Sequence, residues 1–324
     1  MHPKVQIQIV TWNSSKHLER LFTGIEKQEG VDFEVVIIDN ASEDGTKDEI
    51  LRLRSRAFGA LASLRACPEY SEGMTINREN RGFAAGHNQG FEMCKAPYVL
   101  ILNPDTELQE NFLRETVDMI ESESSIASVG GVLYQQLPEP PLNPPLNTGG
   151  EIYRYGVIDS LGLKMRINGQ IVDIGQNCPQ NANLSPKTDV FGITGACVLY
   201  RLSALKSVKD QNGIFDERFH SYKEDADLAW RLHNAGFKAK IATKAIAYHG
   251  RQIKEGDRRN KSDRIKFLSI RNHLLMLKKN LDWRDWWRVP FIIAYELLKF
   301  IYIAIFETQN SKAYKILWTS QSSS

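Results

Sequence analysis

The stretch Phe33-Glu-Val-Val-Ile-Ile-Asp-Asn-Ala-Ser-Glu-Asp-Gly45 is the clearest single indication of the fold. Its first six residues are nearly all apolar, which is typical of a strand that helices cover on both faces. The remainder, from Asp39 to Gly45, is a turn and helix-start signal, and a polar helix is expected over about 46–58. The stretch therefore predicts one strand–helix unit of a parallel sheet.

The same alternation continues on both sides of this unit. Upstream, 5–10 alternates apolar and polar residues as a strand does, and an apolar helical stripe follows over 18–25. Downstream, the pattern predicts strands at 74–77, 98–102 and 126–132, with intervening helices that open near residue 80 and cover 112–120. Strands that alternate with helices predict an α/β protein with right-handed βαβ units and a mostly parallel sheet.

Each of the first four expected strands ends in a small polar cluster. The pairs are Thr11 and Asn13, Asp39 and Asn40, Asn77 and Asn80, and Asn103 and Asp105. Turn formation alone explains one such cluster. Four clusters at one edge of a parallel sheet favour a polar ligand such as a nucleotide, because ligands bind beyond the carboxyl ends of the strands.

The middle of the chain has a different composition. From Leu137 to about Asp189 it is rich in Pro, Gly, Asn and Asp, with short runs at 164–167 and 170–172 that predict small hairpins. We expect a surface excursion over one edge of the sheet. The apolar run 190–200 then returns the chain to the core, and strands are expected at 238–243 and 245–249.

Three acids crowd the start of one expected helix. Glu224, Asp225 and Asp227 precede an apolar stripe that ends at Gly236, so they lie on the first helical turn. N-capping accounts for one or two acids at this position. Three acids leave capping and an active site as competing interpretations.

Charge is spread unevenly along the 324 residues. The formal net charge is +2, but 251–288 holds 12 Lys and Arg against 5 Asp and Glu, a local excess of seven that leaves the remainder at −5. This asymmetry predicts an anionic partner at the C-terminal end, a membrane surface rather than nucleic acid. The four cysteines are far apart, which favours a reduced, cytoplasmic compartment. No apolar signal-peptide core is visible near the N-terminus.

The C-terminal part is expected to be helical. A basic amphipathic helix over 265–279 precedes an 18-residue, mostly apolar run at 289–306, which is at the lower limit for a membrane span. Two charges interrupt the run, and each would cost about 2.5–3.5 kcal/mol at a bilayer centre. On a helix one stripe collects the polar positions: Glu296, Lys299, Glu307 and Asn310. Three aromatic residues come just before the run: Trp283, Trp286 and Trp287. A helix that lies in the membrane interface fits best; a soluble core helix and a dimer face are the alternatives.

Several motifs together resemble those of family 2 glycosyltransferases, which have the GT-A fold. In the expected order they are Ile9-Val-Thr-Trp-Asn13, Val36-Ile-Ile-Asp-Asn-Ala-Ser-Glu-Asp-Gly-Thr46, Asn80-Arg-Gly-Phe-Ala-Ala-Gly-His-Asn-Gln-Gly90, Leu102-Asn-Pro-Asp105, Thr194-Gly-Ala196 and Glu224-Asp-Ala-Asp-Leu-Ala-Trp-Arg231. The match covers about 5–250. The chain is most similar to the rhamnosyltransferase-like members that build bacterial surface polysaccharides, which often share the Asn-Pro-Asp run, the Arg271-Asn272 pair and a hydrophobic tail.

The resemblance implies a domain plan and an activity. A Rossmann-like GT-A domain is expected over 1–250, with a nucleotide-binding half at 1–132 and an acceptor and catalytic half at 133–250. A basic, helical, membrane-associating extension is expected over 251–324. The implied enzyme is an inverting glycosyltransferase that moves a sugar from a nucleotide-sugar donor to a saccharide or polyprenyl-diphosphate-linked saccharide.

The narrowest expectation for the donor is dTDP-rhamnose, and for the location the inner face of the bacterial plasma membrane, as a peripheral cytoplasmic protein. UDP-hexose or UDP-N-acetylhexosamine donors and an inactive nucleotide-sugar-binding scaffold are the alternatives. A dinucleotide-dependent dehydrogenase fits poorly, because the first strand leads into Thr-Trp-Asn-Ser-Ser and not into Gly-x-Gly-x-x-Gly.

The family's donor-binding residues match a set of positions in this chain. Thr11 and Asn13 match positions that hold the nucleoside, and Asp39 matches the acid that pairs with its base. Asn80 and Asn88 flank a glycine-rich helix start that lets backbone approach the donor. Tight helix packing is the alternative explanation for Gly82.

The resemblance also implies a divalent metal, Mg²⁺ or Mn²⁺. Asp105 matches the last acid of the family's Asp-x-Asp metal motif, and such cations prefer carboxylate and phosphate oxygens. Asn103 stands where the general motif has Asp, so metal binding is expected to depend more on the donor's diphosphate. His249 ends a strand where related enzymes place a metal-binding His, with a structural role as the alternative.

The acidic helix start matches the family's catalytic acids. Asp225 matches the general base, which takes the proton of the acceptor hydroxyl. Its neighbour Glu224 is expected to raise the pKa of Asp225 by like-charge repulsion. Asp227 and Arg231 are expected to form a structural pair at i, i+4.

Overall fold

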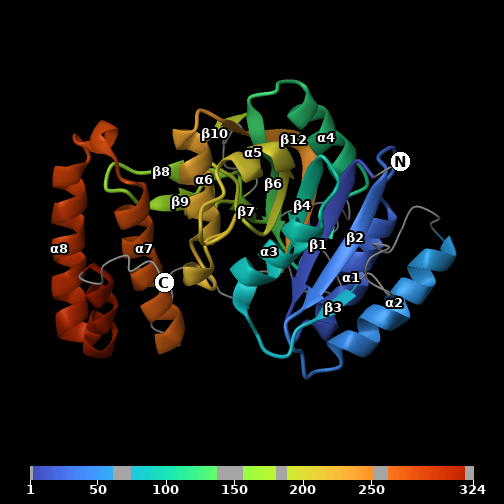
Figure 1. The fold of residues 1–324 in the computed structure, drawn as a ribbon, viewed down its shortest axis with the longest axis horizontal. Helices are drawn as coiled ribbons and strands as arrows, with labels where there is room; N and C mark the ends of the chain where they lie inside the picture. The colour runs from blue at the N-terminus through green and yellow to red at the C-terminus, as the bar shows by residue number, and fades with distance from the viewer. Residues whose placement is uncertain (1–2, 61–73, 137–155, 180–187, 251–261, 318–324) are drawn as a thin grey trace, which may run out of the picture.

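A computed structural model describes residues 3–60, 74–136, 156–179, 188–250 and 262–317 of the chain (Figure 1). Ten strands form one sheet, whose main path runs β10-β12-β6-β11-β4-β1-β2-β3, with β5 on β12 and β7 on β6. These strands are β1 (Val5–Thr11), β2 (Phe33–Asp39), β3 (Met74–Ile76), β4 (Tyr98–Leu102), β5 (Thr106–Leu108), β6 (Ile126–Gln135), β7 (Ile158–Ser160), β10 (Asp189–Val190), β11 (Cys197–Arg201) and β12 (Lys238–His249). Two further strands, β8 (Leu163–Met165) and β9 (Ile171–Asp173), form a separate hairpin.

The N-terminal half of the sheet is parallel. Strands β3, β2, β1 and β4 pair in parallel, and the register places Thr11 directly beside Asp39. Strand β11 is antiparallel to both β4 and β6, and β12 is parallel to β6. The predicted mostly parallel α/β sheet is therefore confirmed, and the carboxyl ends of β1, β2 and β4 meet at one edge.

Helices cover both faces of the sheet. Successive residues of a strand point to opposite faces, so side chains of both sets are buried. Leu100 and Leu102 join one core with α1 (Ser15–Glu26), α2 (Thr46–Ala60) and α4 (Phe112–Glu121). Val99 and Ile101 join the other core with α3 (Gly82–Met93), α5 (Leu202–Ser207) and α6 (Glu224–Asn234). The result is a three-layer arrangement whose central strands are apolar on both faces, as the sequence of β2 predicts.

Two glutamines on β1 depart from the simple alternation of apolar and polar residues. Gln6 and Gln8 are fully buried, because α3 covers the face to which they point. The amide of Gln6 donates to the carbonyl of Gly90 at 3.2 Å. A Cβ at Gly90 would lie 2.6 Å from the Gln8 side chain, so glycine at this position lets the helix approach the strand.

Other expected elements match with a few changes. The two strands expected at 238–243 and 245–249 form the single strand β12, and the predicted small hairpin is β8–β9. The short strands β5, β7 and β10 were not predicted, since two or three residues carry no readable period. The proline-rich run that begins at Leu137 lies outside the described residues.

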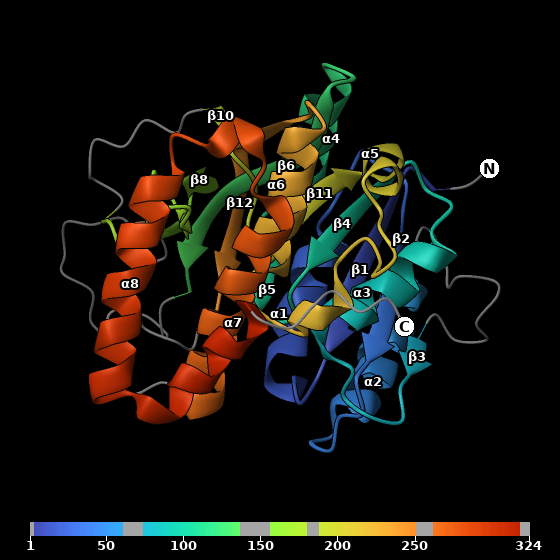
Figure 2. The ribbon, with the colours of Figure 1, turned by 60° about the vertical axis from the view of Figure 1, so that its left-hand side comes forward.

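The C-terminal part is helical, as expected. It comprises α7 (Asp263–Asn280), η4 (Trp283–Asp285), α8 (Val289–Phe306) and η5 (Thr308–Leu317). Figures 1 and 2 show α7 beside α6 and α8 as the outermost helix. Helix α7 buries Leu275 and Met276 in one cluster with Phe219 and Trp230, so it packs directly on the sheet domain.

Helix α8 is amphipathic, but its apolar side chains face outward and its charged side chains face the protein. By length and composition it is able to cross a membrane, and only Ile292 and Ile303 on it are fully covered. Its two charges point inward: Glu296 accepts from Lys299 at 2.7 Å and lies 3.0 Å from the ring of His273 on α7. The expectation of one long polar stripe is corrected, because α8 ends at Phe306, before the stripe's last two members.

Candidate active site

A cavity of about 700 Å³ lies at the carboxyl edge of the sheet. It collects six of the eleven residues to which the sequence analysis gave a donor, metal or catalytic role: Thr11, Asn13, Asn80, Gly82, Asn103 and Asp105. The other five lie outside the lining: Asp39, Asn88, Glu224, Asp225 and His249. The strand-end clusters thus come together around one space, as their order along a parallel sheet requires.

Asp39 lies directly behind this lining. It is fully buried, and its carboxylate accepts a hydrogen bond from the Thr11 hydroxyl at 2.9 Å and from the Ser42 amide at 3.0 Å. The Ser42 hydroxyl also donates to it. Asp39 therefore holds Thr11 and the turn after β2 in place, and pairing of Asp39 with a nucleobase stays a prediction.

Asn13 has a left-handed backbone, with φ of 49°. Its backbone amide donates to the Ser42 hydroxyl at 2.9 Å, and its side-chain oxygen accepts from the backbone amide of Glu43 at 2.9 Å. Asparagine tolerates this conformation better than most residues. The polar groups after β1 and β2 therefore form one rigid corner of the cavity.

Gly82 begins α3 with φ of +83°. A Cβ there would lie 2.6 Å from the backbone oxygen of His220, so only glycine allows this approach. The same glycine lines the cavity, and its amide donates to the side chain of Asn80 at 2.9 Å. Gly82 therefore both packs closely against His220 and forms part of the cavity wall.

Asn88 lies six residues after Gly82 on α3, outside the lining. Its side chain donates to the carbonyl of Phe215 at 2.8 Å and accepts from the Phe215 amide at 3.0 Å. These two bonds fasten α3 to the segment that leads to the acidic helix. Donor binding by Asn88 stays a prediction.

Asp105 and His249 face each other beside the cavity. The distance from His249 Nε2 to Asp105 Oδ1 is 3.3 Å, and His249 Nδ1 lies 2.8 Å from Asp159 Oδ2. Burial lowers the pKa of His249, but the carboxylates of Asp105 and Asp159 raise it to about 9. Asp159 escaped the sequence analysis, since it lies in the segment interpreted as a surface excursion.

Asp105 and His249 are the two side chains for which the sequence implies metal binding, and a divalent cation held by them stays a prediction. A ligating His usually donates its second ring nitrogen to a carboxylate, as His249 does to Asp159. The described residues contain no group of three or more His, Cys, Asp or Glu that could hold a metal. The remaining ligands would therefore be donor phosphate oxygens and water, in line with Asn103 at the position of the motif's first acid.

The first turn of α6 places the two neighbouring acids in different surroundings. Glu224 is buried, and burial together with the charge of Asp225 raises the pKa of Glu224 to about 8. Its Oε2 has no hydrogen-bond partner among the described residues. Asp225 is half-buried and accepts from the backbone amide of Gly195 at 2.9 Å. In the structure the influence thus runs from Asp225 to Glu224, and the reverse influence expected from the sequence stays a prediction.

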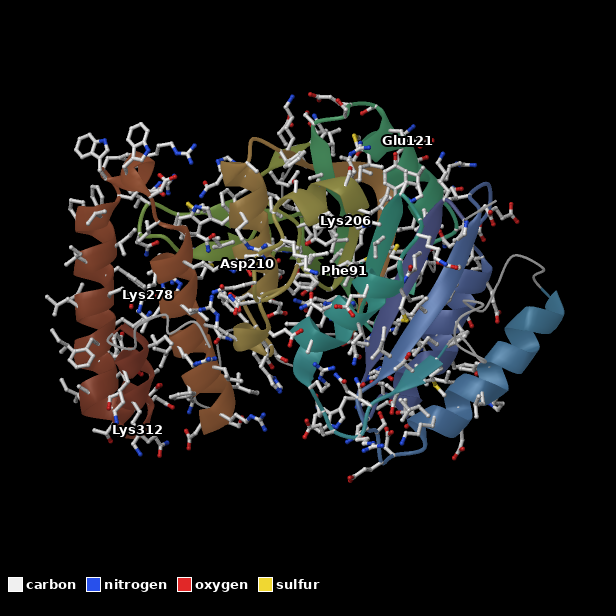
Figure 3. The ribbon with its side chains drawn as sticks, viewed as in Figure 1. Phe91, Glu121, Lys206, Asp210, Lys278 and Lys312 are labelled. Carbon is white, nitrogen blue, oxygen red and sulfur yellow. The ribbon has the colours of Figure 1, made fainter. Side chains whose placement is uncertain are left out.

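Asp227 belongs to a buried ionic cluster. Its carboxylate accepts from Arg231 at 2.9 Å, Asn280 at 2.8 Å and Lys279 at 3.1 Å. Lys279 also lies within 2.9 Å of Asp210, labelled beside α6 in Figure 3, and 2.8 Å from Asp216. The predicted structural pair of Asp227 and Arg231 is confirmed, and the cluster joins α6 to α7.

Helix α7 contributes residues to the cavity that the sequence analysis missed. Arg264, Ile265 and Leu268 line it together with Thr11 and Asn13. Among the described lining residues, Arg264 is the single Lys or Arg. The excess of basic residues after 250 was the available signal, but only the packing of α7 shows which of them reaches the cavity.

Solved structures share this architecture at low sequence identity. The chain aligns with the mannosyltransferase PcManGT from Pyrobaculum calidifontis in complex with GDP-Man and Mn²⁺, with a TM-score of 0.56, 13% identity and coverage of 98% of this chain and 86% of that one. It also aligns with GalNAc-T7 with UDP, GalNAc and Mn²⁺, with a TM-score of 0.57, 14% identity and coverage of 85% of this chain and 48% of that one. These neighbours confirm the GT-A fold.

Curated relatives match in sequence. An N-acetylglucosaminyl-diphospho-decaprenol L-rhamnosyltransferase of Mycobacterium tuberculosis is 23% identical over 282 residues, which span 87% of this chain and 85% of that protein. The glycosyltransferase AglE of Haloferax volcanii is 26% identical over 195 residues, 60% of this chain and 55% of that protein. The profile of glycosyl transferase family 2 matches 7–209, more than half of the chain. This chain therefore belongs to glycosyl transferase family 2.

Proposed function

We propose that this glycosyltransferase inverts the anomeric carbon while it moves a sugar, L-rhamnose from dTDP-rhamnose, to a hydroxyl of a lipid-linked saccharide. One observation carries the proposal: the lining of the cavity at the strand ends includes both Asp105, which pairs with His249, and the segment 220–222, which leads to Asp225. Residues proposed to serve the leaving group and the acceptor therefore meet at one cavity.

The donor is proposed to lie along the carboxyl ends of β1 and β4. Thr11 and Asn13 would hold the nucleoside, and Asn103 and Asp105 would face the diphosphate. Asp105 and His249 would hold Mg²⁺ or Mn²⁺, which neutralises charge on the departing nucleoside diphosphate. Arg264 adds a positive charge to the same cavity, where a phosphate is its natural partner.

Asp225 is proposed as the general base. The acceptor oxygen attacks the anomeric carbon, the bond to the diphosphate oxygen breaks, and the acceptor's proton passes to Asp225. Glu224 holds its own proton at neutral pH because its pKa is about 8, so it adds no second negative charge. The amide of Gly195 donates to Asp225 and aligns its carboxylate.

The proposed sugar and acceptor follow the name of one relative. The mycobacterial relative is named for an L-rhamnosyl transfer to a decaprenol-linked N-acetylglucosaminyl diphosphate, at 23% identity. UDP-hexose and UDP-N-acetylhexosamine are the alternative donors. Asp39, Asp105 and Asp225 are all present, which disfavours an inactive scaffold.

A donor screen tests the proposal. With a lipid-linked saccharide acceptor and Mg²⁺ or Mn²⁺, we expect turnover of dTDP-rhamnose at least tenfold above turnover of UDP- and GDP-sugars. Chelation of the metal with EDTA is expected to abolish the turnover, because without the cation the negative charge of the departing diphosphate is not neutralised. Preference for a UDP-sugar would replace rhamnose in the proposal. The absence of turnover with every donor would favour the scaffold.

The outer face of α8 is proposed to rest on the inner leaflet of the plasma membrane. A soluble surface helix turns its charges outward, whereas α8 turns both inward and exposes side chains such as Leu298, which is 69% exposed. Trp283 and Trp286, 81% and 73% exposed, precede the helix as interfacial anchors do. Arg284 and Arg288 beside them pair with Asp282 and Asp285, so the proposed contact is mainly apolar.

Flotation with phosphatidylglycerol-containing vesicles measures this contact. The triple change Leu298→Glu, Ile301→Glu and Ile305→Glu is expected to lower the bound fraction at least tenfold, since it places charges in the apolar face. Leu51→Glu and Ile76→Glu, at exposed apolar residues of the sheet domain on α2 and β3, form the matched control. Equal flotation of the triple variant and the wild type would contradict the proposal. A wild-type dimer that the triple change dissociates would instead assign the face to a second copy.

A further inference from the structure

The loop just before the acidic helix is attached to α7 through one side chain. Asn272 is fully buried, and its amide nitrogen donates to the carbonyls of Phe219, Ser221 and Tyr222 at 2.9, 2.9 and 2.8 Å. These acceptors come from four consecutive residues. Asn272 therefore fixes the path of the loop backbone, far from its own position in the sequence.

The loop has an unusual backbone that needs such support. His220, Tyr222 and Lys223 have φ of 61°, 73° and 73°, in the left-handed region that residues with a side chain rarely adopt. Such conformations persist only where surrounding contacts impose them. The turn brings several carbonyls close together, and buried carbonyls need donors. The two hydrogen atoms of the Asn272 amide are shared among three of them.

Contacts on both sides hold this arrangement. Arg271 donates to the side-chain oxygen of Asn272 at 3.0 Å and to the carbonyl of Arg218 at 2.8 Å. The oxygen of the Asn272 amide thus faces a cation, and its nitrogen faces the loop. From the opposite side, the amide of Ala84 on α3 donates to the carbonyl of His220 at 3.3 Å. The loop is clamped between α3 and α7.

We propose that Asn272 is a positioning residue for sugar transfer. The loop that it holds lines the donor cavity through His220, Ser221 and Tyr222, and Asp225 follows only three residues after Tyr222. The Asn272 contacts therefore set both a wall of the cavity and the start of α6, on which the base lies. The inference rests on the proposed role of Asp225.

A second asparagine on the same helix provides a matched comparison. Asn280 is also buried on α7, and it donates to Asp227 at 2.8 Å and to the carbonyl of Met276 at 3.0 Å. It connects α7 to α6 without touching the loop. A purely structural contribution to stability is expected from both residues, but control of the loop is expected from Asn272 alone.

The experiment compares Asn272→Leu with Asn280→Leu, since leucine has nearly the same shape but no donor. Both variants are expected to lower the thermal midpoint by similar amounts. With the donor that the wild type uses, we expect Asn272→Leu to lower kcat at least 30-fold and Asn280→Leu to lower it less than threefold. Should Asn272→Leu fail to fold, Asn272→Ser keeps one donor, and a loss of kcat of at least fivefold is expected.

Hydrogen exchange supplies a measurement that does not need turnover. Amides of 219–223 are expected to exchange at least tenfold faster in Asn272→Leu than in the wild type, and at the wild-type rate in Asn280→Leu. A kcat within threefold of the wild type for Asn272→Leu, or equal losses in both variants, would overturn the inference. A wild type inactive with every donor would contradict the proposed function, whereas unchanged exchange of the loop would contradict the clamp itself.

Discussion

Asp225→Asn is expected to lower the rate of sugar transfer by about 10³-fold, a typical contribution of a general base. The change keeps the shape of the side chain, and its remaining oxygen can still accept from the amide of Gly195. It removes the carboxylate that we propose as the acceptor of the proton. Because Asp225 lies outside the lining of the cavity proposed for the donor, donor binding is expected to stay within about threefold of the wild type.

Single-turnover transfer at saturating donor measures the first effect, and calorimetric titration with the nucleotide sugar measures the second. Glu224→Gln is the matched comparison, with a milder expected loss of about tenfold or less, since Glu224 holds its proton at neutral pH. As pH rises through about 8, wild-type Glu224 loses this proton and places a second charge beside Asp225. Retention of more than a tenth of the wild-type rate by Asp225→Asn would assign the base to another residue.

Lys279→Met is expected to lower the free energy of unfolding by about 3–5 kcal/mol, the usual cost of removing one partner from a buried ionic cluster. Lys279 lies within 3.1 Å of three carboxylates, and two of them, Asp216 and Asp227, are fully buried. Without the lysine, the charged partners that remain for these two carboxylates among the described residues are Arg218 and Arg231. The negative charges left in a site of low polarity then oppose folding.

Urea unfolding, followed by tryptophan fluorescence, measures this change. Lys278→Met is the matched control from the neighbouring position of α7: Lys278, labelled in Figure 3, is exposed and donates to the carbonyl of Ile316 at 3.2 Å. Its loss is expected to cost less than about 1 kcal/mol. Equal stability of the two variants would mean that desolvation of Lys279 offsets its attraction to the three carboxylates.

Local patterns in the sequence were enough to predict the arrangement of strands and helices. Each pattern lies within a few consecutive residues, so it can be recognised from the sequence. Examples are the apolar run of β2, the alternation in β1 and the helical stripe of α1. The polar clusters after the strands were also predictable as one group, because parallel strands bring their carboxyl ends to one edge. The bounds of α8 matched the expected 289–306 for the same reason.

Residues of the same chemical type lie in different surroundings in the folded protein. Glu224 and Asp225 are adjacent acids, yet Glu224 points into the protein and has a pKa of about 8, whereas Asp225 is half-exposed. Gln6 and Gln8 were expected as the polar side of a strand and are fully buried beneath α3. Burial depends on what packs across the sheet or helix, which no local window contains.

By itself, the sequence determined the mostly parallel α/β sheet, the order of its motifs and the acidic start of α6, because each depends on neighbouring residues. Only the tertiary structure decided that Asp159 orients His249, that Arg264 reaches the cavity and that Asn272 holds the loop before Asp225. These residues lie 90, 251 and 47 positions from His249, Asn13 and Asp225, respectively. Such contacts form when packing closes long stretches of chain, so they leave no periodic signal in the sequence.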